Sequence, residues 1–165
     1  MKSFKDQTNK VWGDLADKLG TVVEDIIAPN LKGVARTYFQ VDRFNAFAVR
    51  YRKRSSREPQ KEREFDIIAQ SERLFFIDET KTTPRADDVR EFVELLADLP
   101  DYFPESVERT VIPIFSSTAI PQDVRSLLTA HGVYCMVMGE DNMIISNFEQ
   151  VRKDRPGPQE TLADS

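Results

Sequence analysis

One short segment, residues 73–81, constrains the fold more than any other part of this sequence. It runs Arg-Leu-Phe-Phe-Ile-Asp-Glu-Thr-Lys, so its first half is almost entirely apolar and its second half almost entirely charged. An unbroken apolar run of this kind is typical of a buried strand. The charged end must lie where the strand leaves the core, and it therefore needs a chemical explanation.

The periodicity of the remaining sequence predicts an α/β protein. Helices and strands are recognised by their apolar spacing, and proline and glycine mark the ends of elements. The expected helices cover residues 11–27, ended by Pro29, then 31–39, 89–99, ended by Pro100, and 121–130. The expected strands cover residues 44–54, 64–69, 73–81, 111–115, 133–138 and 143–145. Residues 1–150 are expected to form one domain, and residues 151–165 a disordered tail.

Composition excludes several classes of protein. With 165 residues, of which 40% are apolar, the chain has enough material for one folded core. A single cysteine, Cys135, excludes an internal disulfide and a multi-thiolate zinc site. With a single histidine, His131, the chain is poor material for a serine–histidine or cysteine–histidine nucleophile. Any hydrolytic chemistry must therefore use carboxylates and lysine. No apolar run approaches the roughly 18 residues of a membrane helix, so we expect a cytoplasmic protein without a membrane partner.

The charge is distributed unevenly along the chain. The net charge is −5, yet residues 43–63 hold eight basic residues against two acidic ones, so that the rest of the chain carries −11. Strand alternation within residues 44–54 puts Arg50, Arg52 and Arg54 on one face. We expect this face to bind nucleic-acid phosphates, and the alternative is a solvated hairpin arm.

The charged end of the central strand suggests a metal site. Alternation puts Glu79 and Lys81 on the same face, and Asp66 on the neighbouring strand meets Glu79 if its side chain takes that face too. Two adjacent carboxylates repel each other unless a cation lies between them, and Mg²⁺ or Mn²⁺ suits such hard oxygen ligands. Lys81 can then orient a water molecule or stabilise phosphoryl charge, and Glu24, at the border of the first helix's apolar stripe, can lean toward the ion.

These residues resemble the signature of a known superfamily. Asp66, a spacer of twelve residues, and Glu79-Thr80-Lys81 look like the motif of the PD-(D/E)XK nucleases, with Phe65 at the position of the motif's proline. The order of elements resembles their restriction-endonuclease-like αβββαβ core, a central mixed sheet flanked by helices. More narrowly, residues 19–25, 63–67, 78–81 and 112–115 are similar to a group of uncharacterised bacterial nuclease-like proteins.

The resemblance implies a metal-dependent nuclease that hydrolyses phosphodiester bonds. Asp66 and Glu79, with the Thr80 carbonyl, would bind Mg²⁺ (or Mn²⁺), while Lys81 would be the catalytic lysine and Glu24 an assisting acid. DNA is the expected substrate and RNA the second candidate. By analogy with nucleases that cut two strands, a homodimer is an additional expectation.

Two alternatives remain open at this point. The first is a non-catalytic module that keeps the nuclease fold and binds nucleic acid or protein. The second is a regulatory subunit that docks through the first helix, including Trp12, or through the corner at Tyr102 and Phe103. The sequence does not choose between these and the enzyme.

Overall fold

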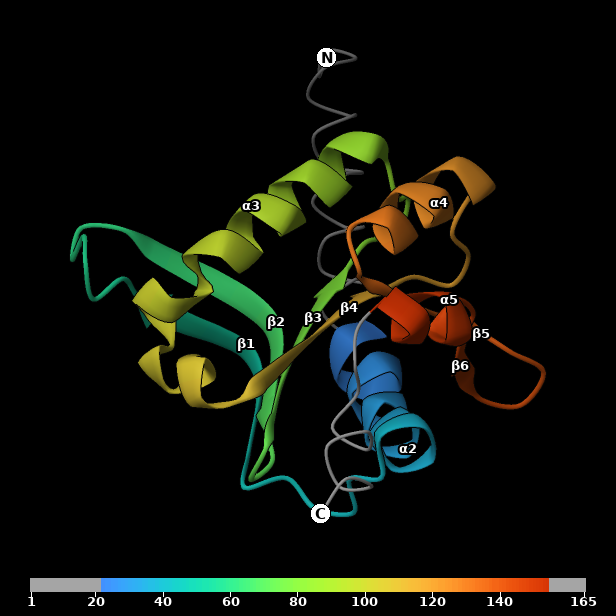
Figure 1. Ribbon diagram of the computed structural model, residues 1–165, viewed down its shortest axis with the longest axis horizontal. Coiled ribbons are helices and arrows are strands. Elements are labelled where there is room, and N and C mark those ends of the chain that lie inside the picture. Colours follow the sequence, from blue (N-terminus) through green and yellow to red (C-terminus); the bar gives the residue numbers. More distant parts are fainter. Residues whose placement is uncertain (1–21, 155–165) are drawn as a thin grey trace, which may run out of the picture.

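Six strands form one mixed sheet whose spatial order follows the sequence (Figure 1). The strands are β1 (Ala46–Arg54), β2 (Glu62–Gln70), β3 (Leu74–Thr80), β4 (Thr110–Ser116), β5 (Tyr134–Met138) and β6 (Met143–Ile145). Strands β1 to β3 run antiparallel, β4 and β5 continue parallel to β3, and β6 turns back antiparallel. The computed structural model describes residues 22–154. Every predicted strand is confirmed to within two residues at each end.

Helices cover both faces of the sheet, as expected for an α/β protein with a mixed sheet. The short π-helix η1 (Val23–Ile27) and α2 (Ala28–Phe39) pack on one face. On the other face lie α3 (Ala86–Tyr102), which connects β3 to β4, and α4 (Gln122–Ala130), which connects β4 to β5. Parallel neighbours need such crossover helices. A 3-10 turn, η2 (Pro104–Glu108), and a last helix, α5 (Phe148–Asp154), complete the structure.

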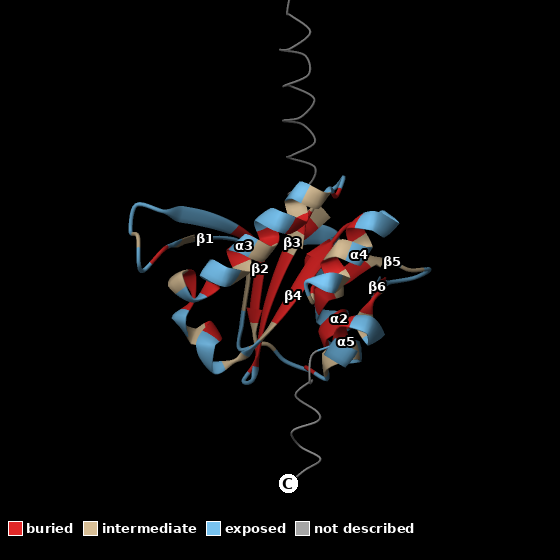
Figure 2. Ribbon diagram, turned by 45° about the horizontal axis from the view of Figure 1, so that its top comes forward, coloured by how far each residue is buried: buried red, intermediate tan, exposed pale blue. Residues whose placement is uncertain are grey.

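The central strand β3 belongs to both cores, which explains its unbroken apolar run. Leu74 and Phe76 pack in the core below η1 and α2, whereas Phe75 and Ile77 pack in the core below α3 and α4. All four side chains are at most 3% exposed. Figure 2 shows the buried colour along the middle strands, while the far ends of β1 and β2 are exposed. The charged end of β3 thus follows a strand that is buried on both faces.

The prediction that Pro29 ends the first helix is wrong. The chain stays helical from Val23 to Phe39, with Pro29 in the first turn of α2. Just before it, the backbone N–H of Ala28 donates to the carbonyl of Val23, a π-type bond that spans five residues. This wider turn brings a proline into the helix without breaking it. The part of the predicted helix before residue 22, with Trp12, lies outside the described residues.

The prediction that Pro100 ends the third helix is also wrong. Helix α3 continues for two more residues, and the N–H of Phe103 donates to the carbonyl of Leu99 at 2.8 Å. A proline this near the end removes only one helical hydrogen bond. The apolar packing of Tyr102 and Phe103, which are 8% and 2% exposed, holds the last turn in place. Because both rings are in the core, they do not form the docking corner expected for a regulatory subunit.

The predicted boundary at residue 150 is placed too early. Residues 151–154 belong to α5, and Val151 is fully buried in the core on the α2 side. The remainder of the expected tail, residues 155–165, lies outside the described residues. Among residues 22–154, no helix combines the length and apolar character needed to cross a membrane.

Candidate active site

The pairing of β1 with β2 is interrupted at one position, where Arg50 lies opposite Asp66. The ladder is regular before and after this position. Val49, the residue before Arg50, pairs with Ile67, but Arg50 and Asp66 do not pair. The backbone of Arg50 has a φ of 51°. This left-handed conformation costs a residue other than glycine about 1–2 kcal/mol. The strain is concentrated beside one of the predicted site residues.

The interruption also changes the direction in which β2 presents its side chains. Ile67 packs in the core below α2, whereas Phe65 packs in the opposite core against the rings of Tyr102 and Phe103. Regular alternation would put residues 65 and 67 on the same face. Asp66 therefore lies at a bend. Beyond it, residues 51–65, here called the hairpin arm, run alongside α3 (Figure 1).

The structure brings Asp66 and Glu79 together. Ile67 pairs with Asp78 across β2 and β3, so one further step along the register puts Asp66 opposite Glu79. The backbone N–H of Thr80 donates to Oδ2 of Asp66 at 2.8 Å, which holds this carboxylate against the end of β3. Repulsion from Asp66 contributes to a raised pKa of Glu79, which is consistent with the two carboxylates lying close together.

Lys81 completes this group on the same side. Its Nζ lies 3.8 Å from Oε1 of Glu79, and the two side chains are 37% and 23% exposed. The backbone N–H of Lys81 donates to the carbonyl of Ser116 on β4 at 3.1 Å. The cation is thus anchored to the sheet at its backbone, while its side chain remains open to solvent.

Burial dominates the electrostatics of the two acids. It raises the pKa of Asp66, against the lowering effects of the Thr80 N–H, Lys81 and Arg50. Burial and the neighbouring Asp66 raise the pKa of Glu79 to about 7, despite Lys81. At neutral pH such a pair takes up a proton or binds a cation, because two charges in so little water are unfavourable.

A third acid, Asp78, lies beneath this group, and sequence reasoning assigned it no role. It is 1% exposed, and its Oδ2 accepts a hydrogen bond of 2.7 Å from Oγ of Ser116 on β4. The hydroxyl of Thr80 donates more weakly to its Oδ1 at 3.5 Å. Burial, with repulsion from Asp66 and Glu79, raises its pKa well above the usual range. The alternation of β3 could have indicated this position of Asp78, because it turns residues 78 and 80 to the face opposite residue 79.

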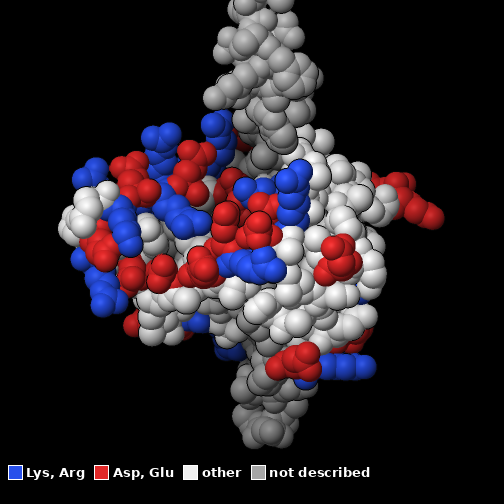
Figure 3. Space-filling model, turned by 90° about the horizontal axis from the view of Figure 1, so that it is seen from above, with Lys and Arg blue, Asp and Glu red and all other residues white. Residues whose placement is uncertain are grey.

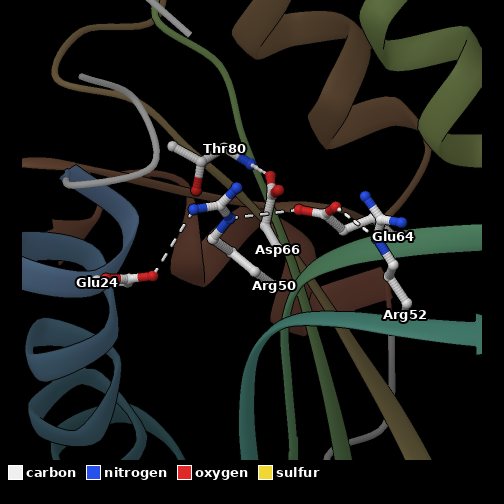
Figure 4. Close-up of polar contacts among 6 residues, drawn as sticks. All are labelled: Glu24, Arg50, Arg52, Glu64, Asp66 and Thr80. Carbon is white, nitrogen blue, oxygen red and sulfur yellow. Dashed lines mark hydrogen bonds and ion pairs between the residues drawn. The ribbon is translucent and has the colours of Figure 1, made fainter. Parts of the chain in front are cut away.

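Glu24 does not join the other acids directly. It lies on η1, and its Oε1 is 3.9 Å from Nη1 of Arg50. The Nε of Arg50 is also 3.4 Å from Oε1 of Glu64 on β2. Figure 4 shows the Arg50 side chain between Glu24 on one side and Asp66 and Glu64 on the other. Arg50 therefore lies between Glu24 and Asp66, where Glu24 was expected to approach the metal ion.

The predicted basic face is paired with acids along its length. Arg52 lies 3.4 Å from Glu64, and Arg54 lies 3.5 Å from Glu62. Figure 3 accordingly shows positive and negative side chains mixed where the charges gather. Glu64 lies one residue beyond the segment in which the basic excess was counted, and the register of the hairpin, which places it opposite Arg52, brings it onto this face. Binding of nucleic acid by Arg50, Arg52 and Arg54 stays a prediction.

The donors at the site suit a hard divalent ion. Asp66 and Glu79 offer carboxylates, and Thr80 offers a backbone carbonyl, so all donors are oxygens. Within residues 22–154, no three side chains of His, Cys, Asp or Glu are grouped to hold a metal. Mg²⁺ tolerates so small a set because it keeps several water ligands. These oxygen donors are of the kind that Mg²⁺ or Mn²⁺ prefers and zinc does not, and binding of either ion stays a prediction.

No family model, no curated protein and no solved structure matches the chain.

Proposed function

We propose that the protein is a metal-dependent nuclease that hydrolyses phosphodiester bonds in DNA at Asp66, Glu79 and Lys81. The observation that carries this proposal is the meeting of these three side chains at the end of a strand buried on both faces. The ion pair of Glu79 with Lys81 contributes little stability, so a structural role does not explain why two acids lie where partial burial raises the pKa of both.

The sequence motif and the order of elements support the same proposal. Asp66 and Glu79-Thr80-Lys81 keep the spacing of the PD-(D/E)XK motif. A helix, three antiparallel strands, a crossover helix and a parallel strand follow one another here as in the αβββαβ core of that superfamily. The proposal places the site where the second and third of these strands end their pairing.

Each residue would have a distinct role in the reaction. Asp66, Glu79 and the Thr80 carbonyl would hold Mg²⁺ or Mn²⁺, which supplies positive charge for the phosphate and acidifies a bound water. The Thr80 N–H keeps one oxygen of Asp66 oriented at 2.8 Å. Lys81, with a partly exposed ammonium group, would orient the attacking water and stabilise the charge that develops on the phosphoryl oxygens.

A cleavage assay with matched lysine variants tests the proposal. Plasmid, linear and single-stranded DNA are incubated with Mg²⁺ or Mn²⁺ and the wild type, Lys81→Ala or Lys61→Ala. Lys61, in the turn of the hairpin arm, also pairs with a glutamate, at 2.6 Å, but lies away from Asp66. We expect Lys81→Ala to lower the cleavage rate at least about 100-fold and Lys61→Ala to leave it unchanged. Equal cleavage rates of the two variants would mean that the activity does not depend on Lys81.

One observation favours the non-catalytic alternative, a DNA-binding module with this fold. Glu24, expected to assist the metal, is engaged with Arg50 instead. If wild type and variants bind DNA with steep salt dependence but none cleaves it, this alternative replaces the enzyme.

A further inference from the structure

Arg50 is the residue of the site that the proposed reaction does not use. Its guanidinium links η1 to β2, with Nη1 3.9 Å from Glu24 and Nε 3.4 Å from Glu64. Its backbone is held in the left-handed region opposite Asp66, at the only interruption of the β1–β2 ladder. A strained backbone persists only where the surrounding structure holds it in place, and such positions cluster at functional sites.

Arg50 puts a positive charge beside an acid of the proposed metal site. Figure 4 shows its guanidinium beside Asp66 and Thr80, with Glu24 and Glu64 at its flanks. Its charge already attracts the Asp66 carboxylate. A divalent ion bound to Asp66 and Glu79 would meet this positive charge at close range, and like charges at such distances repel.

We propose that Arg50 is an internal cation that competes with the divalent ion for the acids of this site, withholds Glu24 from the ion and lowers the site's affinity for Mg²⁺ and Mn²⁺. This inference rests on the metal site of the proposed function. Binding of the ion is then coupled to release of Arg50 from Glu24, and the exposed guanidinium, freed in this way, becomes available to an entering phosphate.

Arg52 provides a matched control on the same strand. It carries the same charge and contacts the same acid, with its Nε 3.4 Å from Glu64. Within residues 22–154, however, Glu24 forms its ion pair with Arg50 and none with Arg52. Replacing Arg52 therefore changes the total charge equally but leaves the cation beside Asp66 in place.

The experiment measures Mn²⁺ affinity of the full chain by calorimetry, without DNA, for wild type, Arg50→Gln, Arg52→Gln and Asp66→Asn. We expect Arg50→Gln to bind Mn²⁺ about tenfold more tightly than wild type, and Arg52→Gln to stay within about twofold, because screening weakens charges farther away. Asp66→Asn should lose most of the binding. Adding Glu24→Gln to Arg50→Gln should reverse part of the gain, because Glu24 is the acid that Arg50 releases.

The possible failures are distinguishable. If Asp66-dependent Mn²⁺ binding is equally tight in wild type, Arg50→Gln and Arg52→Gln, the competition is refuted while the metal site stands. If Arg50→Gln binds more weakly than wild type, Arg50 supports the ion and the inference is reversed. If no variant binds Mn²⁺ although thermal unfolding shows that all are folded, the metal site and the competition are both refuted.

Discussion

Two glutamate–lysine pairs of this protein behave in opposite ways. Glu58 and Lys61 form a pair at 2.6 Å in the turn of the hairpin arm, and the lysine lowers the pKa of the glutamate. Glu79 and Lys81 form a pair at 3.8 Å at the end of β3, yet the pKa of this glutamate rises to about 7. The residue types are the same, but the separations and the surroundings of the two pairs differ.

The closer contact of Lys61 with Glu58 and the access of water to each pair both contribute to the difference. In the exposed turn, water solvates both charges, so the attraction of the lysine is the dominant effect on the carboxylate. At the end of β3, Phe75, Phe76 and Ile77 precede the pair and Asp66 lies beside it, so burial and repulsion outweigh the lysine. A buried carboxylate with a raised pKa is a candidate for function, whereas an exposed ion pair is common on protein surfaces.

The largest expected effect compares the two glutamates directly. A glutamate whose folded pKa is about 7, against an unfolded value near 4.5, folds preferentially in its protonated form. Its penalty is absent below pH 4.5 and develops fully as the pH rises through 7. We therefore expect Glu79→Gln to raise the free energy of unfolding at pH 8 by about 2–3 kcal/mol more than at pH 4.5.

Glu58→Gln should show the opposite trend. Its lowered folded pKa means that the charged form contributes stability above the unfolded pKa, and the variant loses this contribution. Urea unfolding of wild type and both variants at pH 4.5 and 8, in a metal chelator, measures both effects. A Glu79→Gln variant with no pH-dependent gain would mean that water reaches this carboxylate freely and that the contrast between the pairs is absent.

A second prediction compares Arg50 at the site with Arg52 in the hairpin arm. Glycine adopts a φ of 51° without strain, so Arg50→Gly should relieve about 1 kcal/mol. The two ion pairs that it loses are exposed and contribute at most about as much, so the net change in unfolding free energy should stay near zero. Arg52→Gly, without such relief, should destabilise by about 1 kcal/mol. Chemical denaturation at neutral pH measures both, and equal losses would argue against strain at Arg50.

The sequence predicted the strands around the candidate site more completely than the ion pairs beside it. Alternation along β3 predicted that Phe75 and Ile77 share one face, and the structure confirms it. The same alternation extends to Glu79. It could not reveal that Arg50 separates Glu24 from Asp66. That contact depends on the break in alternation at Asp66 and on a cross-strand register, neither of which local periodicity encodes.

The two misjudged prolines have a related cause. The sequence predicts a helix end at Pro29 and at Pro100, because a proline removes a hydrogen bond and restricts the residue before it. In the structure, buried side chains on both sides of each proline, such as Ile27 and Leu31 around Pro29, keep the helix continuous. Tertiary packing keeps both helices continuous past the proline, and a rule based on local sequence does not include this packing.

The smallest expected effect lies farthest along the hairpin arm. Arg54 and Glu62 are 3.5 Å apart with side chains 67% and 44% exposed, so Arg54→Gln should change the unfolding free energy by less than about 0.5 kcal/mol. If the arm contacts DNA phosphates, the same variant should lower the slope of log affinity against log salt by about 1 without changing the slope's sign. Salt titrations of DNA binding measure this slope. An unchanged slope would mean that Arg54 does not contact DNA phosphates. A large loss of stability would mean that the hairpin arm is far less solvated than the pair Glu58–Lys61 implies.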